Sequence, residues 1–137
     1  MQLNTYLNFD GNCAQAFDYY ARHIGGQVVA LMKFGDGPMA QHTPAQDRDK
    51  VMHARIDLPG GTLMGTDCTS DRPWQPIRCA YVVLHVDDAA SAERIFGALA
   101  DGGKVEMPLQ QTFWAHRYGI TVDRFGVPWM VNCEKPG

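Results

Sequence analysis

A histidine, an arginine and an aspartate, His53, Arg55 and Asp57, alternate with apolar residues in this 137-residue chain. Histidine titrates close to neutral pH, and a neighbouring carboxylate can orient its ring. His53 is therefore a candidate general base or ligand anchor. The alternative is a hydrogen-bonded histidine of a β-strand with no catalytic role.

Two arginines, Arg55 and Arg117, are candidates for binding an anion. A guanidinium group presents forked donors that match a carboxylate or a phosphate. In the alternative reading, each arginine pairs with an acid of the chain, such as Asp57 or Asp123. The sequence leaves both readings open.

Large aromatic side chains offer flat surfaces for a planar ligand, although they commonly form plain core instead. Methionine adapts to irregular space, so methionines near a ligand would serve as packing. The aromatic candidates are Tyr6, Tyr81, Trp114 and Trp129, and the methionines are Met64 and Met130.

Composition restricts the class of partner. The net charge of −3 comes from interspersed residues, which argues against nucleic acid as a partner. The N-terminal residues lack the regions of a signal peptide, and no segment approaches the ~20 apolar residues of a membrane helix. We therefore expect a cytoplasmic protein with no membrane partner. The four cysteines form no CxxC pair and are expected to be reduced structural thiols.

Apolar residues at helical spacing predict amphipathic helices near residues 12–24 and 88–101. Asn12 is suited to capping the start of the first helix, Asp87 and Asp88 are the candidate caps of the second, and a pair of glycines follows each helix. A shift of 77 positions lays Leu7 on Leu84 and the glycines of the first helix on those of the second. The chain is therefore expected to contain two copies of one module.

Each copy reads as one strand, one helix and three further strands. Towards the end of each copy the shift becomes 66, which leaves extra residues in the first copy between 35 and 49. We expect one α+β domain over 1–137, in which βαβββ modules at about 1–67 and 78–135 form a cup-shaped mixed sheet with the helices outside. The expected strands lie near 2–9, 27–34, 50–58, 62–67, 79–86, 104–110, 113–122 and 128–134.

Alternation along the strands predicts which side chains face the cup. In each strand the apolar set should meet the helix, and the other set should line the concave surface. A slip of one residue would reverse the facing of a whole strand. The lining residues expected from strand alternation include Asn4, Tyr6, His53, Arg55, Tyr81, His85 and Arg117.

Several segments resemble the PhnB-like, demethylubiquinone methyltransferase-like branch of the glyoxalase/bleomycin resistance/dioxygenase (vicinal oxygen chelate) superfamily. The fairly specific part is Phe113–Gly119 followed by an Asp-x-Phe-Gly-x-x-Trp segment that ends at Trp129. The resemblance extends over nearly the whole chain and implies the cup-shaped fold. The other segments that carry it are Tyr6–Asn12, His53–Asp57 and Leu63–Asp67.

The resemblance also implies where a divalent metal would bind in related enzymes, with one ligand from the first and last strand of each module. Those positions map to Asn4, Met64, Tyr81 and Met130. Thioethers and an amide are poor ligands for zinc, nickel or iron, so we expect neither a metal nor another cofactor. The chain has no glycine-rich S-adenosylmethionine loop, so the branch name does not imply methyl transfer here.

The leading hypothesis is a metal-free protein that encloses a polar-aromatic or anionic metabolite or antibiotic, and the resemblance implies that it forms a homodimer. A lyase, isomerase or dioxygenase with a non-standard site is the alternative, and a purely structural protein with a closed cup is a third. Whether the modules pair within one chain or between two chains stays open. The candidate binding residues are Asn4, Tyr6, His53, Arg55, Met64, Tyr81, His85, Trp114, Arg117 and Met130.

Overall fold

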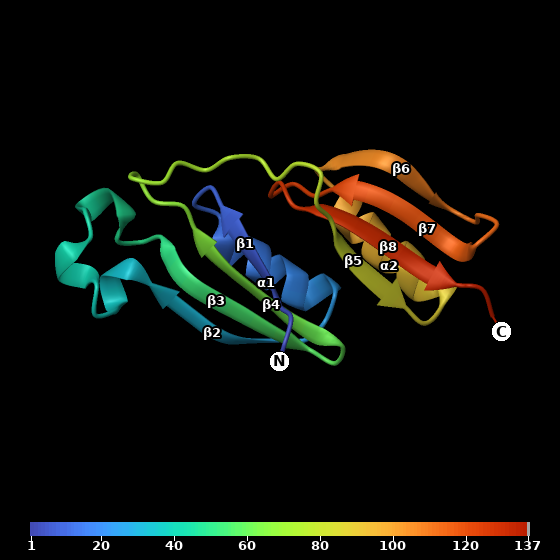
Figure 1. The fold of residues 1–137 in the computed structure, drawn as a ribbon, viewed down its shortest axis with the longest axis horizontal. Helices are drawn as coiled ribbons and strands as arrows, with labels where there is room; N and C mark the ends of the chain where they lie inside the picture. Colours follow the sequence, from blue (N-terminus) through green and yellow to red (C-terminus); the bar gives the residue numbers. More distant parts are fainter. Residues whose placement is uncertain (137) are drawn as a thin grey trace. The chain divides into compact units, whose positions relative to one another are not determined.

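The computed structural model describes residues 1–136. The chain folds into two compact units, Met1–Gln75 and Pro76–Gly137 (Figure 1). Each unit contains one helix and one four-stranded mixed sheet, so the predicted α+β class is confirmed. No helix among these residues is long and apolar enough to span a membrane.

In the first unit the chain forms β1 (Thr5–Phe9), α1 (Cys13–His23), β2 (Gln27–Lys33), β3 (Val51–Leu58) and β4 (Gly61–Asp67). The strand order is β1-β4-β3-β2, with β1 parallel to β4 and the other pairs antiparallel. Short 3-10 turns at Phe34–Asp36, Ala40–His42 and Ala45–Asp47 occupy the long connection between β2 and β3. The extra residues of the first copy therefore lie where the sequence predicts them.

The second unit repeats this connectivity with β5 (Val82–Val86), α2 (Ala89–Ala100), β6 (Lys104–Gln110), β7 (Ala115–Val122) and β8 (Pro128–Glu134). Its strand order is β5-β8-β7-β6, and β5 runs parallel to β8. The predicted duplication is thus confirmed at the level of strand order. Both β1 and β5 begin three residues later than the sequence suggests.

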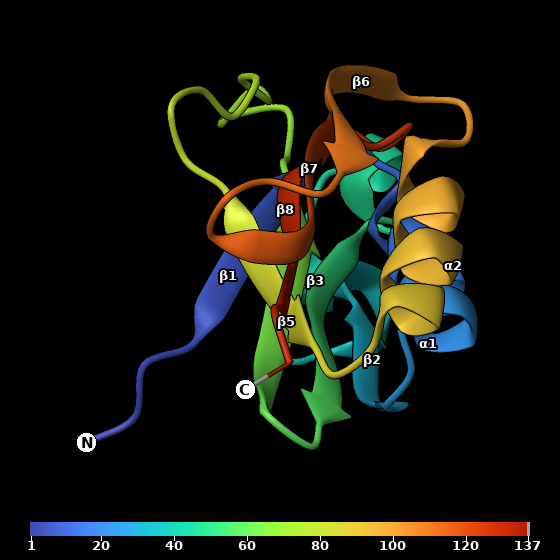
Figure 2. The same cartoon turned by 90° about the vertical axis from the view of Figure 1, so that its right-hand side faces the viewer.

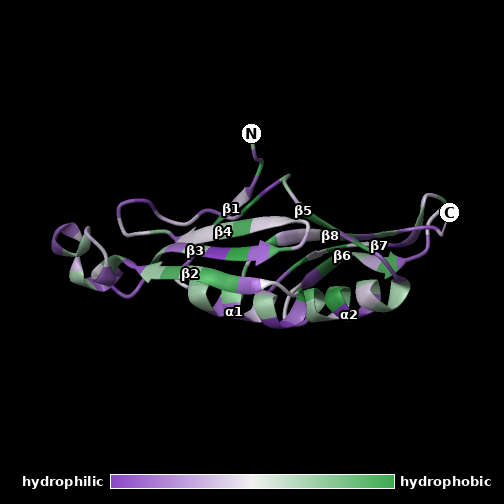
Figure 3. Ribbon diagram, turned by 90° about the horizontal axis from the view of Figure 1, so that it is seen from below, coloured by the Kyte–Doolittle hydropathy of each residue, from purple (hydrophilic) through white to green (hydrophobic). Residues whose placement is uncertain are grey.

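The helix α1 packs its apolar stripe against one face of the first sheet (Figure 3). Phe17 is fully buried, and its ring meets that of Phe9 edge-on with centroids 5.9 Å apart. A Cβ atom added to Gly65 of β4 would lie 2.8 Å from the Phe17 ring, so only glycine leaves room for this aromatic contact. The buried helix residues are Cys13, Ala16, Phe17 and Tyr20.

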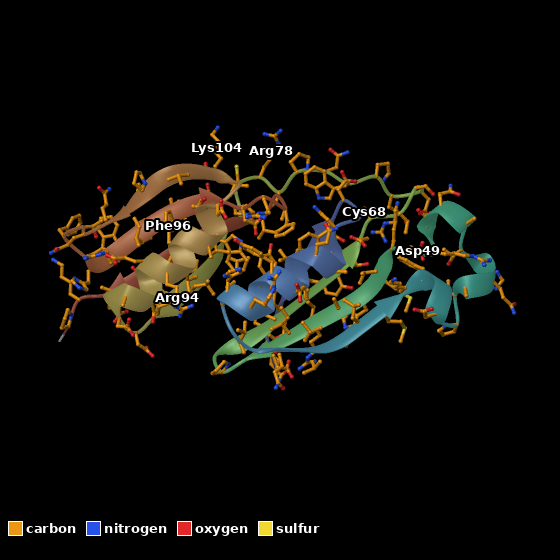
Figure 4. All side chains as sticks on the ribbon, turned by 180° about the vertical axis from the view of Figure 1, so that it is seen from behind. Asp49, Cys68, Arg78, Arg94, Phe96 and Lys104 are labelled. Atoms are coloured by element: carbon orange, nitrogen blue, oxygen red, sulfur yellow. The ribbon has the colours of Figure 1, made fainter. Side chains whose placement is uncertain are left out.

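The helix α2 covers one face of the second sheet in the same way (Figure 2). Phe96, labelled in Figure 4, lies over β7, where a Cβ atom on Gly119 would approach its ring to 2.8 Å. Each helix therefore places a phenylalanine over a strand glycine. The buried residues of α2 are Ala92, Ile95, Phe96 and Leu99.

The strand β7 faces the opposite way from the sequence-based prediction. The connection between paired Asp57 and Thr62 contains four residues, whereas the corresponding connection between Val122 and Pro128 contains five. This one-residue difference changes which side chains of β7 point toward the helix. Thr121 is fully buried, and Gly119 meets the Phe96 ring. Arg117 shares their parity and therefore belongs to the helix-facing set.

Candidate functional site

The face of the first sheet that is turned away from α1 carries polar and aromatic side chains. Tyr6 and Asn8 are exposed while Leu7 and Phe9 are buried, as the alternation of β1 predicts. In β3, Ala54 and Ile56 are buried and the intervening Arg55 is not. The predicted facing of β1 and β3 is therefore confirmed.

Tyr6 and His53 contact each other on this face. The Tyr6 hydroxyl lies 3.4 Å from His53 Nδ1, and the two rings are stacked with centroids 5.9 Å apart. Partial burial raises the pKa of the Tyr6 hydroxyl above its usual value. Because Nδ1 faces the tyrosine, the Nε2 atom of His53 is left to meet a ligand or a proton.

Arg55 is engaged by an acid two residues away. Its Nε atom donates to Asp57 Oδ1 at 2.7 Å, and Thr62 Oγ1 lies 3.4 Å from the same oxygen. Both charged side chains are partly exposed, so the pair contributes little to stability. The structure supports the pairing alternative for Arg55.

The metal positions implied by the resemblance do not form a fitting donor set. Met64 lies opposite Tyr6 in the register, and Met130 lies opposite Val83. Asn4 and Tyr81 precede their strands. The negative charge of Glu106, which accepts from the Tyr81 hydroxyl at 3.5 Å, raises the pKa of this tyrosine. Two thioethers, an amide and a tyrosine do not suit a divalent ion. Residues 1–136 also contain no cluster of three His, Cys, Asp or Glu side chains placed to hold a metal.

A polar row crosses the corresponding face of the second sheet. His85 of β5 pairs in register with Asn132 of β8, and Asn132 pairs with Tyr118 of β7. Asn132 Nδ2 lies 3.2 Å from His85 Nδ1, which holds the imidazole ring in place. The Tyr118 hydroxyl donates to Met130 Sδ at 3.3 Å. Three neighbouring strands thus present ordered polar groups on one surface.

Aromatic residues flank this row at the start of β7. Trp114 packs against Tyr118 with ring centroids 5.5 Å apart, and it remains half exposed. The turn before it is closed by Thr112, whose hydroxyl accepts from the Ala115 amide and whose amide donates to the Ala115 carbonyl, both at 3.0 Å. Trp114 is therefore presented from a well-defined turn.

A cleft of about 680 Å³ opens at the His85 end of the row. Three side chains on its walls carry ring or amide nitrogens, those of His85, His116 and Asn132. Acidic side chains and a lysine also lie on its walls. The full lining is His85, Val86, Asp87, Asp88, Ala89, His116, Asn132, Cys133, Glu134, Lys135 and Pro136.

The predicted orientation of Arg117 is wrong. Its Nε atom donates to Glu93 of α2 at 3.3 Å, and Nη1 donates to the His116 carbonyl at 2.8 Å. The five-residue connection after β7 is the physical reason, because it shifts the strand by one position. Trp129 belongs to the core, where its indole donates to Asp123 at 2.8 Å, so it offers no stacking surface.

Sequence reasoning missed Tyr118, Asn132 and His116. The shift of one residue in β7 moves Tyr118 and His116 onto the face that carries His85. Asn132 could have been found from its own strand, because it lies between the buried residues Val131 and Cys133. Alternation in β8 was the available signal.

Comparison with known proteins agrees with this architecture. The sequence profile of the family described as 3-demethylubiquinone-9 3-methyltransferase matches residues 1–132. Protein YjdN of Escherichia coli is 34% identical over 147 residues, which cover 98% of this chain and 97% of YjdN.

Solved structures show the same fold. Protein PA1353 from Pseudomonas aeruginosa is 47% identical with a TM-score of 0.91, over 99% of each chain. A PhnB protein from Bacillus cereus has a TM-score of 0.76 at 21% identity, over 97% of this chain and 99% of its own. A glyoxalase/bleomycin resistance/dioxygenase domain from Frankia reaches 0.67 at 12% identity, over 98% of each chain. The chain therefore belongs to the PhnB-like family described as 3-demethylubiquinone-9 3-methyltransferase, and it has the fold of the glyoxalase/bleomycin resistance/dioxygenase superfamily.

Proposed function

We propose that this chain binds a flat, polar small molecule without the help of a metal ion. The observation that carries the proposal is the row of His85, Asn132 and Tyr118 on one face of the second sheet. Hydrogen-bonding groups held on neighbouring strands beside an exposed aromatic ring are typical of small-molecule sites. The adjoining cleft of about 680 Å³ lies within the size range of such sites.

The chemistry of the donors supports binding without a metal. FosX of Listeria monocytogenes, which shares only the fold at 7% identity, was crystallised with Mn(II) and a dihydroxypropylphosphonic acid. The residues at the implied metal positions of this chain include Met64 and Met130, whose thioethers are poor ligands for such an ion. Direct contacts from side chains would have to replace the metal.

An aromatic ligand is better supported than an anionic one. Arg55 is paired with Asp57 at 2.7 Å, and Arg117 is paired with Glu93 at 3.3 Å on the helix-facing side. Neither guanidinium group is left unpaired for a carboxylate or phosphate. Trp114 and Tyr118 offer ring surface instead.

The test is a ligand screen with and without prior chelation. Thermal shift and protein-detected NMR should identify planar, polar compounds that bind equally to chelated and untreated protein, because a ligand of the native state stabilises it. Tyr118→Ala and His85→Ala should each weaken binding about tenfold. His42→Ala, at an exposed position of the first unit, is the control and should leave affinity unchanged.

Two results would contradict the proposal. Metal found at one equivalent per chain by elemental analysis, with binding lost on chelation, would show that the ligand is held through an ion. A hit whose affinity is unchanged in both Tyr118→Ala and His85→Ala would place binding elsewhere. The first unit then becomes the place to search, with Tyr6, His53, Arg55 and Met64 as the contact candidates.

A second candidate function is acid–base catalysis, favoured by the contact between Tyr6 and His53. A histidine with one nitrogen held by a hydroxyl group can exchange a proton through the other. With a confirmed substrate, His53→Ala should abolish turnover and leave substrate binding within about threefold. Unchanged turnover would exclude this function for the pair.

We also propose that the chain is a cytoplasmic homodimer. The edge strand β2 supports self-association, because four of its apolar side chains are exposed and an uncovered apolar edge favours pairing. Sedimentation velocity should show a dimer, and Val29→Lys with Leu31→Lys should shift it toward monomer. A monomer at all concentrations would refute the dimer. Cell fractionation tests the location.

A further inference from the structure

His85 and Asn132 form a hydrogen-bonded pair on the wall of the cleft in the second unit. The two residues lie opposite each other on the neighbouring strands β5 and β8, and both line the cleft. Asn132 Nδ2 lies 3.2 Å from His85 Nδ1. An amide nitrogen donates and cannot accept, so Nδ1 is the acceptor of this bond. A neutral imidazole carries one N–H proton, which in His85 is therefore on Nε2.

The pair consequently presents one donor beside one acceptor. The Nε2–H group of His85 is the donor, and the Oδ1 atom of Asn132 is the acceptor. Within residues 1–136, neither atom has a hydrogen-bonding partner. The bond between the two side chains determines which ring nitrogen carries the proton, so a molecule in the cleft meets a fixed pattern of donor and acceptor.

Charge alone does not define the ligand of this cleft, because its walls carry both signs. Three carboxylates and one ammonium group line it, those of Asp87, Asp88, Glu134 and Lys135. The donor and acceptor of the His85–Asn132 pair are more selective, because a ligand that matches only one of them leaves the other without a partner, which costs free energy.

We infer that the ligand of this site carries a cis-amide group, as found in a lactam ring. Its carbonyl oxygen accepts from Nε2 of His85, and its N–H group donates to Oδ1 of Asn132. A carboxylate offers only acceptors and an ammonium group only donors, so each would match one half of the pair. The inference rests on the proposed function, since it names the ligand class for the same site.

The position of the His85 proton can be tested without a ligand. Asn132→Asp replaces the donor Nδ2 by an oxygen that only accepts, so the His85 proton should move to Nδ1. NMR of the histidine ring nitrogens in the isotope-labelled full chain, at about pH 8.5 where the ring is neutral, shows which nitrogen carries the proton. We expect Nε2–H in the parent chain and Nδ1–H in the variant. Asn8→Asp, on β1 of the first unit, is the matched control and should leave the His85 ring unchanged.

Three probes with a common bicyclic ring test the ligand class. Carbostyril is a lactam with a carbonyl oxygen and an N–H group, N-methylcarbostyril lacks the N–H group, and quinaldate carries a carboxylate. NMR titration of the labelled full chain gives each dissociation constant. We expect carbostyril to bind about tenfold more tightly than N-methylcarbostyril, because the methyl group leaves Asn132 Oδ1 without a donor. Quinaldate should also bind more weakly than carbostyril.

Variants of the pair locate the effect. Asn132→Leu removes the acceptor at nearly constant volume and should reduce the preference for carbostyril over N-methylcarbostyril to less than about twofold. A preference that came only from the bulk of the methyl group would survive this change. Asn8→Leu is the control in the first unit and should keep the preference. His85→Ala should weaken both lactams together, since each has the carbonyl oxygen that His85 meets.

The outcomes separate the inference from the proposed function. Equal binding of the two lactams, a preference that survives Asn132→Leu, or a His85 proton that stays on Nε2 in Asn132→Asp would overturn the amide ligand class and leave small-molecule binding intact. Carbostyril that does not shift resonances of the second sheet would overturn it as well. The proposed function fails on a different result, a ligand screen in which no hit is sensitive to His85→Ala or Tyr118→Ala.

Discussion

The two units share strand order and helix placement, yet each buries a carboxylate at a different end of its own sheet. In the first unit, Asp67 at the end of β4 accepts the amides of Cys13 and Val51 at 2.9 and 2.8 Å. Figure 4 labels Cys68 and Asp49, which mark this end of β4 and the approach to β3. In the second unit Cys133 lies near the corresponding end of β8, and the buried carboxylate is Asp123, in the β7–β8 connection.

The difference shows which group accepts the free backbone amides in the first turn of each helix. Asn12 makes no side-chain cap bond to α1, and Asp67, at the end of strand β4, accepts the Cys13 amide instead. Asp88 caps α2 by accepting the Ser91 amide, so β8 need not provide a carboxylate. Free amides at a helix start require an acceptor, but the fold leaves open which element provides it.

Loss of Asp123 should have the largest effect on stability. Its carboxylate accepts the amides of Phe125 and Val127 at 2.9 Å each and the Trp129 indole at 2.8 Å. Asp123→Ala should lower the free energy of unfolding by about 3 kcal/mol, because these donors lose a buried acceptor. Urea denaturation measures the loss, and hydrogen exchange should place it in the second unit. Asp123→Asn, which keeps an acceptor oxygen, should cost less.

Asp67→Cys gives the first unit the residue type found in the second and should cost about 2 kcal/mol. The reason is that Asn12 provides no substitute cap, so the amides of Cys13 and Val51 lose their acceptor. Denaturation with hydrogen exchange at the start of α1 measures this loss. Cys133→Ser is the matched control and should cost less than Asp67→Cys. Equal losses of unfolding free energy in the two variants would mean that the ends of β4 and β8 contribute equally to stability.

The next largest difference in stability should come from replacing the glycines that lie under Phe96 and Phe17. A methyl group on Gly119 would meet the Phe96 ring at 2.8 Å and the Leu109 backbone at 2.9 and 3.0 Å. A methyl group on Gly65 would meet the Phe17 ring at 2.8 Å and one backbone oxygen at 3.1 Å. We expect Gly119→Ala to cost about 2 kcal/mol and Gly65→Ala about 1 kcal/mol, since a ring yields more easily than backbone. A larger loss for Gly65→Ala in thermal unfolding would reverse this part of the comparison.

The smallest effects should come from the helix caps, with Asp88→Asn costing more than Asn12→Ala. The amide and hydroxyl groups of Ser91 hold the pKa of Asp88 below its usual value. A lowered folded-state pKa means that the carboxylate stabilises the protein above about pH 4 and loses this effect as pH falls through the folded pKa. The melting temperatures of Asp88→Asn and the parent chain should therefore converge as the pH falls through this lowered pKa. A constant gap from pH 7 downward would refute the charged cap.

Much of the fold follows from local patterns. The apolar spacing of Cys13, Ala16 and Phe17 predicts α1, and the glycines after each helix predict its end. Alternation in β1 and β3 likewise predicts that Tyr6 and His53 share a face, because side chains along a strand alternate. The match between copies predicts that both units repeat one succession of strands and helix. These features depend on residues close together in the chain.

The site in the second unit depends on information that local patterns lack. One additional residue between Val122 and Pro128 reverses β7, which removes Arg117 from the open face and brings Tyr118 beside Asn132. The contacts of Arg55 with Asp57 and of Arg117 with Glu93 likewise change the expected ligand charge. Pairing between distant strands and between strand and helix decides such contacts.

By itself, the amino-acid sequence determined the duplicated module, its helices and strands, and the facing of strands whose hydrophobic alternation is clear. Only the tertiary structure decided the register of β7, the partners of the arginines and the acceptor for each helix start. The physical reason is how far apart in the chain the interacting residues lie. Periodicity reflects the geometry of a single element, whereas register and charge pairing depend on where another element comes to lie against it.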